Sequence, residues 1–263
     1  MQKNLYFKSV LRRKNHFKNF ILDAFLAVAS YPRLLLEVFI RKNFGERYFS
    51  ASAVFTIAFI LGIYPLVAHK MYETYSRYLG NGDSGFWWHY ISWYFFLAAF
   101  LYFSWLRHKE VKRNPSTFDF GRFSLCTGDI HPAFRNVKIS GNQPTIRTIE
   151  IYLEPAFFTG LGIVLMLFGQ ALGSWLIVFA IMYSLSYAAA YKHGDDFVLD
   201  IIDDGIMNEE LEEAFVENPE GDNKRGVRFY TRKPKSVSLR RRLSKSFIEN
   251  DRQEQEEPLS IAE

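Results

Sequence analysis

The stretch SASAVFTIAFILGIYPLVA, which runs from Ser50 to Ala68, decides the fold class of this chain of 263 residues. Its nineteen residues include no Asp, Glu, Lys or Arg. Because a helix needs about 20 apolar residues to cross about 30 Å of hydrocarbon, the stretch predicts a membrane-spanning helix. Pro65 lies near its end, where water or neighbouring groups can satisfy the carbonyl that a proline leaves free. The sequence therefore predicts an integral membrane protein.

A second apolar block runs from Phe86 to Leu106 and predicts another crossing. Trp87 and Trp88 stand at one end and Trp105 at the other, as expected where aromatic belts meet the two membrane surfaces. His89 lies in the first turn, so we interpret it as a headgroup-level histidine rather than a buried proton carrier.

The third apolar block covers 157–191, which is too long for one crossing at 1.5 Å of rise per residue. Turn-forming residues lie in its middle, in the run GQALGS at 169–174. They favour two short spans joined by a tight reversal, and a single long tilted helix is the alternative. The expected architecture is thus an all-α integral membrane protein with about four spans, over 50–68, 86–106, 156–170 and 174–191.

The distribution of Lys and Arg predicts the orientation of these spans. The segment 1–49 contains ten Lys or Arg and the loop 107–155 contains eight, whereas 69–85 contains only two. Positively charged segments stay in the cytoplasm. With four spans, both positive segments and the C-terminal tail lie on that side, in a plasma or inner membrane.

The N-terminal region 1–49 is basic and amphipathic. We expect one or two helices at the membrane surface, broken at Tyr31-Pro32, with Arg12, Arg13 and Lys14 near anionic lipid headgroups. The alternative is that these helices, including the apolar run Leu34–Ile40, pack on the protein's own bundle. A cleaved signal peptide is disfavoured, because Asp23 interrupts the apolar run that it would need.

The loop 107–155 predicts a small cytoplasmic element. Val137–Ile139 and Ile146–Tyr152 alternate polar and apolar residues as strands do, which suggests a hairpin. The loop is too short to bury a large core alone. We therefore expect it to lean on the N-terminal helices or on a partner protein.

The acidic segment 192–222 holds twelve Asp or Glu against one Lys and contains the only cluster that resembles a site. On a helix, His193, Asp196, Asp200 and Asp203 form one stripe, whose oxygen and imidazole ligands suit a divalent metal. The DDxxxD spelling around Asp200 is similar to motifs that hold magnesium in membrane prenyl transferases, but a second such motif is missing. The alternative is an amphipathic juxtamembrane helix with a packed apolar side and a wet acidic side.

The tail 223–263 is basic at first and then acidic. Ten Lys or Arg between 224 and 245, with few apolar residues, predict a partly disordered segment. Arg240, Arg241 and Arg242 form its most basic run and predict binding to anionic lipid headgroups or to an acidic partner. Nucleic acid is also compatible but is not favoured by a net charge of only +4. A plain role in fixing membrane topology is the simplest alternative.

Three classes of function remain. The preferred one is a non-catalytic membrane component that scaffolds or anchors a larger assembly, such as a secretion, DNA-transfer or envelope complex, with protein partners or further copies of itself. The second is a metal-dependent enzyme acting on lipid-linked diphosphates through the acidic stripe. The third, a small transporter subunit, is disfavoured because the spans hold no Asp, Glu, Lys or Arg.

The chain has no phosphate-binding Gly-rich loop, nucleophile elbow or metalloprotease helix, and its single Cys126 excludes a disulfide framework. We therefore expect no enzyme activity and no cofactor.

Overall fold

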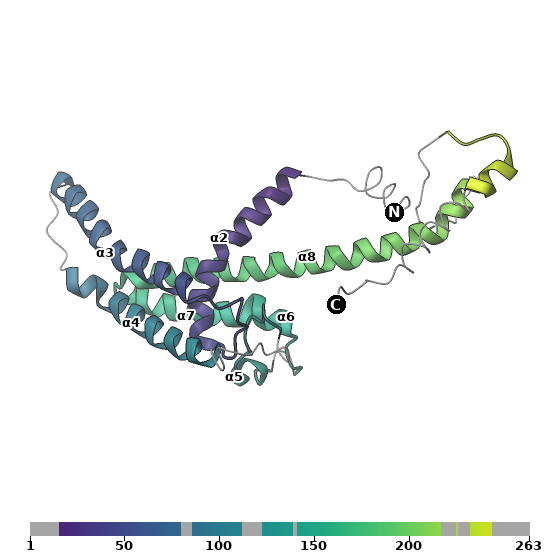
Figure 1. The fold of residues 1–263 in the computed structure, drawn as a ribbon. Helices are drawn as coiled ribbons and strands as arrows, with labels where there is room; N and C mark the ends of the chain where they lie inside the picture. The colour runs from purple at the N-terminus through teal and green to yellow at the C-terminus, as the bar shows by residue number, and fades with distance from the viewer. Residues whose placement is uncertain are drawn as a thin grey trace, which may run out of the picture. The chain divides into compact units, whose positions relative to one another are not determined.

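The computed structural model of the protein describes residues 16–79, 86–111, 123–138, 141–216, 225 and 232–243. Its named elements are α2 (His16–Ile40), α3 (Ala51–Leu79), α4 (Phe86–Val111), α5 (Pro132–Arg135), α6 (Ile146–Thr148), the π-helix η2 (Ile149–Leu153), α7 (Glu154–Leu167) and α8 (Ala171–Val216) (Figure 1). The described residues include no strand, only an isolated bridge between Lys42 and Asp129. The prediction of an all-helical chain is confirmed for this part. The chain forms two compact units, Phe20–Tyr191 and a second one made of Met1–Asn19 with Lys192–Glu263.

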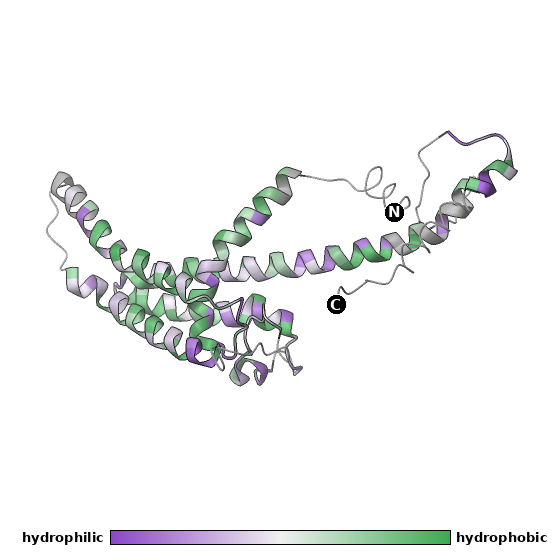
Figure 2. Ribbon diagram, viewed as in Figure 1, coloured by the Kyte–Doolittle hydropathy of each residue, from purple (hydrophilic) through white to green (hydrophobic). Residues whose placement is uncertain are grey.

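Three helical segments among the described residues are long and apolar enough to cross a membrane. They are Ala51–Met71, Ile146–Leu167 and Ala171–Met207. Large apolar side chains such as Phe59 and Leu167 are exposed on them, as lipid contact requires, and Figure 2 shows how hydrophobic these segments are. The membrane character of the protein is thus supported by its helices. The helix α4 is not among the three, because Trp, Tyr and His interrupt its Phe and Leu residues.

The helices α3, α4, α7 and the start of α8 run in alternating directions (Figure 1). The Trp93 indole of α4 donates a hydrogen bond to the Leu61 carbonyl of α3 at 2.7 Å. Gln170, between α7 and α8, donates to the Trp88 carbonyl near the start of α4 at 2.8 Å. The turn after α7 therefore lies at the same end of the bundle as the start of α4.

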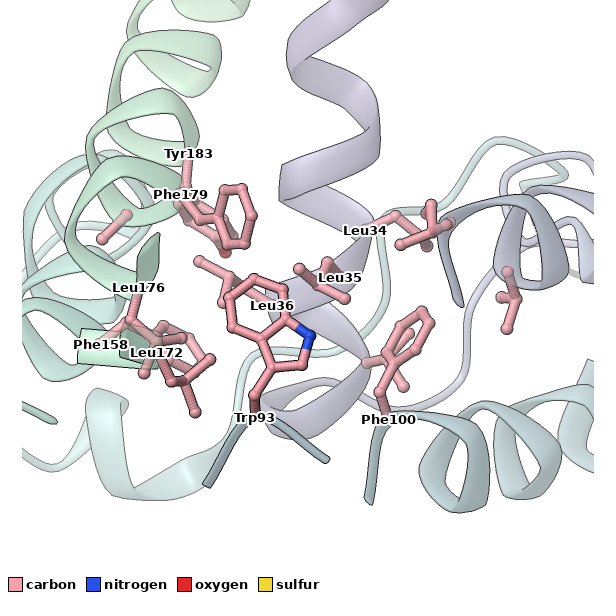
Figure 3. Packing of buried hydrophobic residues seen from close by; sticks show 14 of the residues in the cluster. Leu34, Leu35, Leu36, Trp93, Phe100, Phe158, Leu172, Leu176, Phe179 and Tyr183 are labelled. Carbon is pink, nitrogen blue, oxygen red and sulfur yellow. The ribbon is translucent and has the colours of Figure 1, made fainter. Parts of the chain in front are cut away.

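The second half of α2 forms the centre of this bundle. Leu35, Leu36 and Val38 are fully or almost fully buried. Figure 3 shows the leucines of α2 between side chains of α8 and of α4, among them Phe179, Tyr183, Trp93 and Phe100. For the run Leu34–Ile40, the alternative of packing on the protein's own bundle is therefore correct.

The predicted break at Tyr31-Pro32 is wrong. The helix α2 continues through Pro32 to Ile40, and it changes direction partway along its length (Figure 1). A proline inside a helix removes one hydrogen bond and bends the helix without having to end it, and the buried leucines that follow hold the helix in place. Phe17, Phe20 and Val28 of its first half are exposed, so surface binding of that half stays a prediction.

Two prolines in the apolar helices leave carbonyls that neighbouring helices satisfy. In an α-helix, the missing N–H of Pro65 would have bonded the carbonyl of Leu61, and that of Pro155 the carbonyl of Ile151. The Leu61 carbonyl accepts from the Trp93 indole instead. The Ile151 carbonyl accepts from the Ser184 hydroxyl of α8 at 2.7 Å. Each proline thus creates a polar contact between helices, as happens where water is excluded.

The block 157–191 forms a helical hairpin. The helix α7 ends at Leu167, Gly169 adopts a φ of 70°, and α8 begins at Ala171. The two helices approach closely at Gly162 and Gly173, since a Cβ on Gly162 would lie 2.8 Å from the Gly173 carbonyl. The turn residues therefore form the tight reversal, and the alternative of one long helix is wrong.

Residues 123–129, after α4, pack against the segment that follows α2. This is expected for a loop that is too short to bury a large core alone. Residues of the two segments exchange backbone hydrogen bonds, from Gly45 to Cys126 and from Arg47 to Ser124, both at 2.9 Å. The predicted strand over Ile146–Tyr152 is wrong, because these residues form α6 and most of η2. Thr145 caps this helix by accepting from the Thr148 N–H. Ile149 and Ile151, which the alternation assigned to a strand face, are buried by the helix instead.

The second unit holds the later part of α8 and a short helix over 237–243 that the sequence did not predict. The Arg240 side chain donates to three backbone carbonyls, those of Pro234, Lys235 and Val216. Val216 is the last residue of α8, so a cation lies at the negative end of the helix dipole. Met207, Phe215 and Val216 are buried here.

Candidate functional site: a buried cluster of charged and tyrosine side chains

A cluster of ionisable side chains lies inside the unit Phe20–Tyr191, which we call the Arg41 cluster. Its members come from three helical rows spaced by four residues, so that each row lies on one face of its helix. The rows are Arg33 and Glu37 on α2, with Arg41 directly after its end; Glu150 and Glu154 on η2 and α7; and Tyr183, Tyr187 and Tyr191 on α8. Tyr48, Thr127 and Ser186 complete the cluster.

Arg41 is the centre of the cluster, and its side chain is fully buried. Its guanidinium forms a bidentate pair with Glu154, through Nε to Oε1 at 3.2 Å and through Nη2 to Oε2. Nη1 lies 3.1 Å from a Glu150 oxygen and donates to the Tyr187 hydroxyl at 2.6 Å. It also donates to Thr127 at 3.2 Å. Arg41 thus joins α2 to η2, α7, α8 and the segment after α4.

Glu37 is fully buried, as are Arg41 and Glu154. One of its oxygens accepts from the Tyr48 hydroxyl and the other from the Tyr187 hydroxyl, each at 2.5 Å. Arg33 lies 3.5 Å from Glu37, donates to Tyr48 at 3.0 Å and to Ser186 at 3.2 Å. Both carboxylate oxygens of Glu37 therefore have hydrogen-bond donors.

The two remaining carboxylates are also held by tyrosines. Tyr183 donates to Glu154, and Tyr191 donates to Glu150 at 2.6 Å. Arg147 stacks over the Tyr191 ring, with its guanidinium carbon 5.1 Å from the ring centre. Each buried carboxylate needs such partners, because an unpaired charge in a medium that excludes water costs several kcal/mol.

The three carboxylates of the cluster outnumber the two guanidinium groups that pair with them. Arg33 and Arg41 face Glu37, Glu150 and Glu154, which leaves an excess of negative charge if all are ionised. Burial raises the pKa of Glu37 above its ordinary value, although Arg41 and Arg33 act in the opposite direction. Burial also raises the pKa of Tyr48 well above its ordinary value, so the Tyr48 hydroxyl stays a hydrogen-bond donor.

The arrangement acts as a polar connection between the packed helices. Each of the three carboxylates accepts from an arginine or a tyrosine of another element. The cluster fixes the position of α2 in the bundle, because Arg41 and Glu37 lose all of these partners if the helix moves. The paired charges and hydrogen bonds support a structural role, in which the cluster holds the helices together. Buried ionisable groups of this kind also occur at functional sites of membrane proteins.

The predicted metal ligands lie on α8, where His193, Asp196 and Asp203 are exposed and Asp200 is half-buried. No group of three or more His, Cys, Asp or Glu side chains that could hold a metal ion is found in the described ranges. The helical stripe is therefore present, and metal binding by it stays a prediction.

The predicted basic binding residues fall into two sets. Arg12, Arg13 and Lys14 lie outside the described residues. Arg241 and Arg242 are exposed, whereas Arg240 is half-buried against the end of α8 by its bonds to backbone carbonyls. Headgroup binding by the exposed arginines remains untested, and Arg240 has a structural use within the chain.

The Arg41 cluster was missed from the sequence, although a signal was present. The run Leu34–Ile40 is apolar except for Glu37 in its middle, and Arg33 and Arg41 flank that run. A charged residue inside an apolar helix, with opposite charges four residues away on both sides, indicates a buried pair. The Glu150 and Glu154 row was hidden by the strand assignment.

The chain matches no protein-family model, and neither the curated proteins nor the solved structures include a significant match to it.

Proposed function

We propose that the protein is a non-catalytic integral membrane component that anchors or scaffolds a larger assembly through its cytoplasmic segments. The observation that carries this proposal is α8, which runs without a break from Ala171 to Val216. Its 46 residues correspond to about 69 Å at 1.5 Å per residue. Only about 20 of them are needed to cross the hydrocarbon, so the same helix continues from the membrane part into the acidic segment.

We infer that the membrane part crosses the bilayer four times, with α3, α4, α7 and the start of α8 as spans. The alternation in direction of these helices supports α4 as the fourth span. Phe95 of α4 is exposed, and Trp87 and Trp105 are exposed near the ends of its aromatic stretch, as at membrane surfaces. Four crossings place both chain ends and the Arg41 cluster at the cytoplasmic side.

The Arg41 cluster gives this anchor its rigidity. It ties α2, the segment after α4, α7 and α8 together at one end of the bundle. A scaffold must transmit position from the membrane to its partners, and a buried, satisfied ion network suits that purpose better than apolar packing alone. The acidic face of α8, which includes Asp196 and Asp203, then offers the partners a charged surface.

Purification of the full chain from its native membrane in mild detergent tests the proposal. Other proteins should co-purify in fixed proportion, and mass spectrometry should identify them. A matched variant with Asp196→Asn and Asp203→Asn should lose at least one of these partners while keeping the same helical content. If the chain is recovered without any other protein from both preparations, the assembly proposal is wrong.

A further inference from the structure

The stretch 130–149, which includes α5 and α6, carries positive charge and no negative charge. It contains Arg135, Lys138 and Arg147 but no Asp or Glu. Arg147 lies over the Tyr191 ring. Arg135 and Lys138 are exposed, and Val137 between them is 42% exposed. The surface of α5 and of residues 136–138 is therefore cationic, with an exposed apolar side chain in its middle.

The acids on either side of this stretch have partners of their own. Asp129, just before it, accepts from the Asn43 side chain at 2.7 Å. Glu150, just after it, is buried, accepts from Tyr191 and pairs with Arg41. The charge of Arg135 and Lys138 is therefore presented to the surroundings of the protein.

The helix α7 has an exposed apolar face that begins at Phe157. Phe157, Leu161 and Val164 follow the helical spacing of four and three residues and are 52%, 43% and 49% exposed. They belong to the segment Ile146–Leu167, which is long and apolar enough to cross a membrane. When α7 spans the bilayer, this face contacts the lipid chains, and Phe157 marks the point where it enters them.

The cationic surface is held beside that point. Phe134 of α5 packs edge-on against Phe157, with ring centres 6.0 Å apart, and α5 also contacts η2. Tyr152 of η2 is 65% exposed, and tyrosines on spanning helices are enriched at the level of the lipid headgroups. Figure 1 shows α5 and α6 at one end of the bundle. The surface therefore lies where α7 enters the membrane.

We propose that α5 and residues 136–138 bind anionic lipids of the cytoplasmic leaflet. Phe134 and Val137 lie at the boundary of the acyl chains, and Arg135 and Lys138 contact lipid phosphates. This inference rests on the proposed four crossings, which put the surface at that leaflet. A free phosphate ion would leave the apolar side chains in water, and a protein partner would have to displace lipid beside Phe157, so lipid fits the surface best.

Fluorescence quenching in vesicles tests the lipid contact. The full chain in a Cys126→Ser background, which has no other cysteine, carries a fluorophore on Val137→Cys. In vesicles of phosphatidylcholine and phosphatidylglycerol, lipids brominated on their acyl chains should quench this probe several-fold more than one on Asn142→Cys, an exposed position of the same loop. Quenching at Val137→Cys should be weaker in phosphatidylcholine alone, because the cations then lack anionic partners.

Charge-matched variants test the role of the two cations. Arg135→Gln with Lys138→Gln should lower quenching of the Val137→Cys probe several-fold. Lys42→Gln with Arg47→Gln removes the same charge from two exposed positions after α2 and should leave quenching unchanged. Helical content and elution in detergent check that each variant keeps its fold.

Three results would overturn the lipid contact: equal quenching at positions 137 and 142, no effect of the Arg135 and Lys138 substitutions, or an equal effect of the control pair. A surface made for a protein partner would leave the Val137→Cys probe unquenched in vesicles that contain this chain alone. A probe on Leu161→Cys separates this failure from that of the crossings. Quenching there without quenching at Val137→Cys refutes the lipid contact alone, whereas an unquenched Leu161→Cys probe refutes the crossing of α7 and this inference with it.

Discussion

Arg41 directly follows the 25-residue helix α2 and donates hydrogen bonds to Glu154 and Tyr187, so its removal should destabilise the bundle. Arg41→Gln leaves Glu154 and Glu150 buried without their shared cation. Breaking a buried pair from one side costs about 3–5 kcal/mol, and we expect a loss of this size in the free energy of unfolding in detergent. Arg47→Gln, at an exposed arginine of the next segment, should change it by less than about 0.5 kcal/mol. Similar effects of the two substitutions would show that the cluster does not stabilise the bundle.

Glu37 should respond to pH in the direction opposite to an ordinary ion-paired carboxylate. Because burial raises its pKa in the folded protein, the folded state holds the proton more tightly than the unfolded chain. The stabilisation from that proton is complete below the ordinary pKa of 4.5 and is lost as the pH rises through the raised value. Glu37→Gln is fixed in the neutral form. The stability of Glu37→Gln relative to the parent should therefore increase as the pH rises above the ordinary pKa of 4.5, measured by thermal unfolding in detergent. A difference that decreases with pH would mean that Arg33 and Arg41 outweigh burial.

At the scale of elements, the closest approach of two helices can be tested with one substitution at two positions of α7. A Cβ on Gly162 would lie 2.8 Å from the Gly173 carbonyl and 2.9 Å from Ile177, whereas one on Gly160 would meet nothing within 4 Å. Gly162→Ala should destabilise the protein by about 1–3 kcal/mol through overpacking. Gly160→Ala should be neutral or stabilise it by up to about 1 kcal/mol, because alanine favours the helix. If both glycines tolerate alanine equally, α7 and α8 are not packed as described.

The carbonyl freed by Pro65 gives a second test at this scale. Trp93→Phe keeps an aromatic ring but removes the donor to the Leu61 carbonyl, at an expected cost of about 1–3 kcal/mol. In a Pro65→Ala background the alanine N–H can bond that carbonyl, so the same tryptophan substitution should cost less by about 1 kcal/mol. A double-mutant cycle measures this difference. Costs that add without coupling would show that the proline and the tryptophan do not act on one carbonyl.

Elements whose sequence signal lies in neighbouring residues could be predicted, and elements that depend on contacts distant in the chain could not. The helix beginning at Ala51, the turn at Gly169 and the helical character of 192–216 follow from nearby residues, and the structure agrees. The strand over Ile146–Tyr152 was wrong because alternation over seven residues resembles a helix whose buried positions happen to be Ile149 and Ile151. The continuation of α2 through Pro32 depends on packing against α4 and α8. The residues next to Pro32 in the sequence do not reveal this packing.

For the molecule as a whole, membrane character was predictable and the interior contacts were not. Uncharged stretches identify spans, because hydrocarbon cannot solvate charges. The Arg41 cluster joins residues separated by up to 153 positions, as in the pair Arg33 and Ser186. Such pairs become visible only once the helices are placed. Lys and Arg residues outside the spans predict orientation, yet some of them, such as Arg41, lie inside the fold.

The central claim, four crossings with both ends in the cytoplasm, is tested most directly by labelling single cysteines from one side of the membrane. In the Cys126→Ser background, cysteines replace Asn81, Asn142 and Lys235, and intact cells are treated with a maleimide that does not cross membranes. We predict labelling of the Asn81→Cys protein alone, with all three labelled after permeabilisation. Labelling of Asn142→Cys or Lys235→Cys in intact cells would contradict the account, because α4 or α8 would then not cross as proposed.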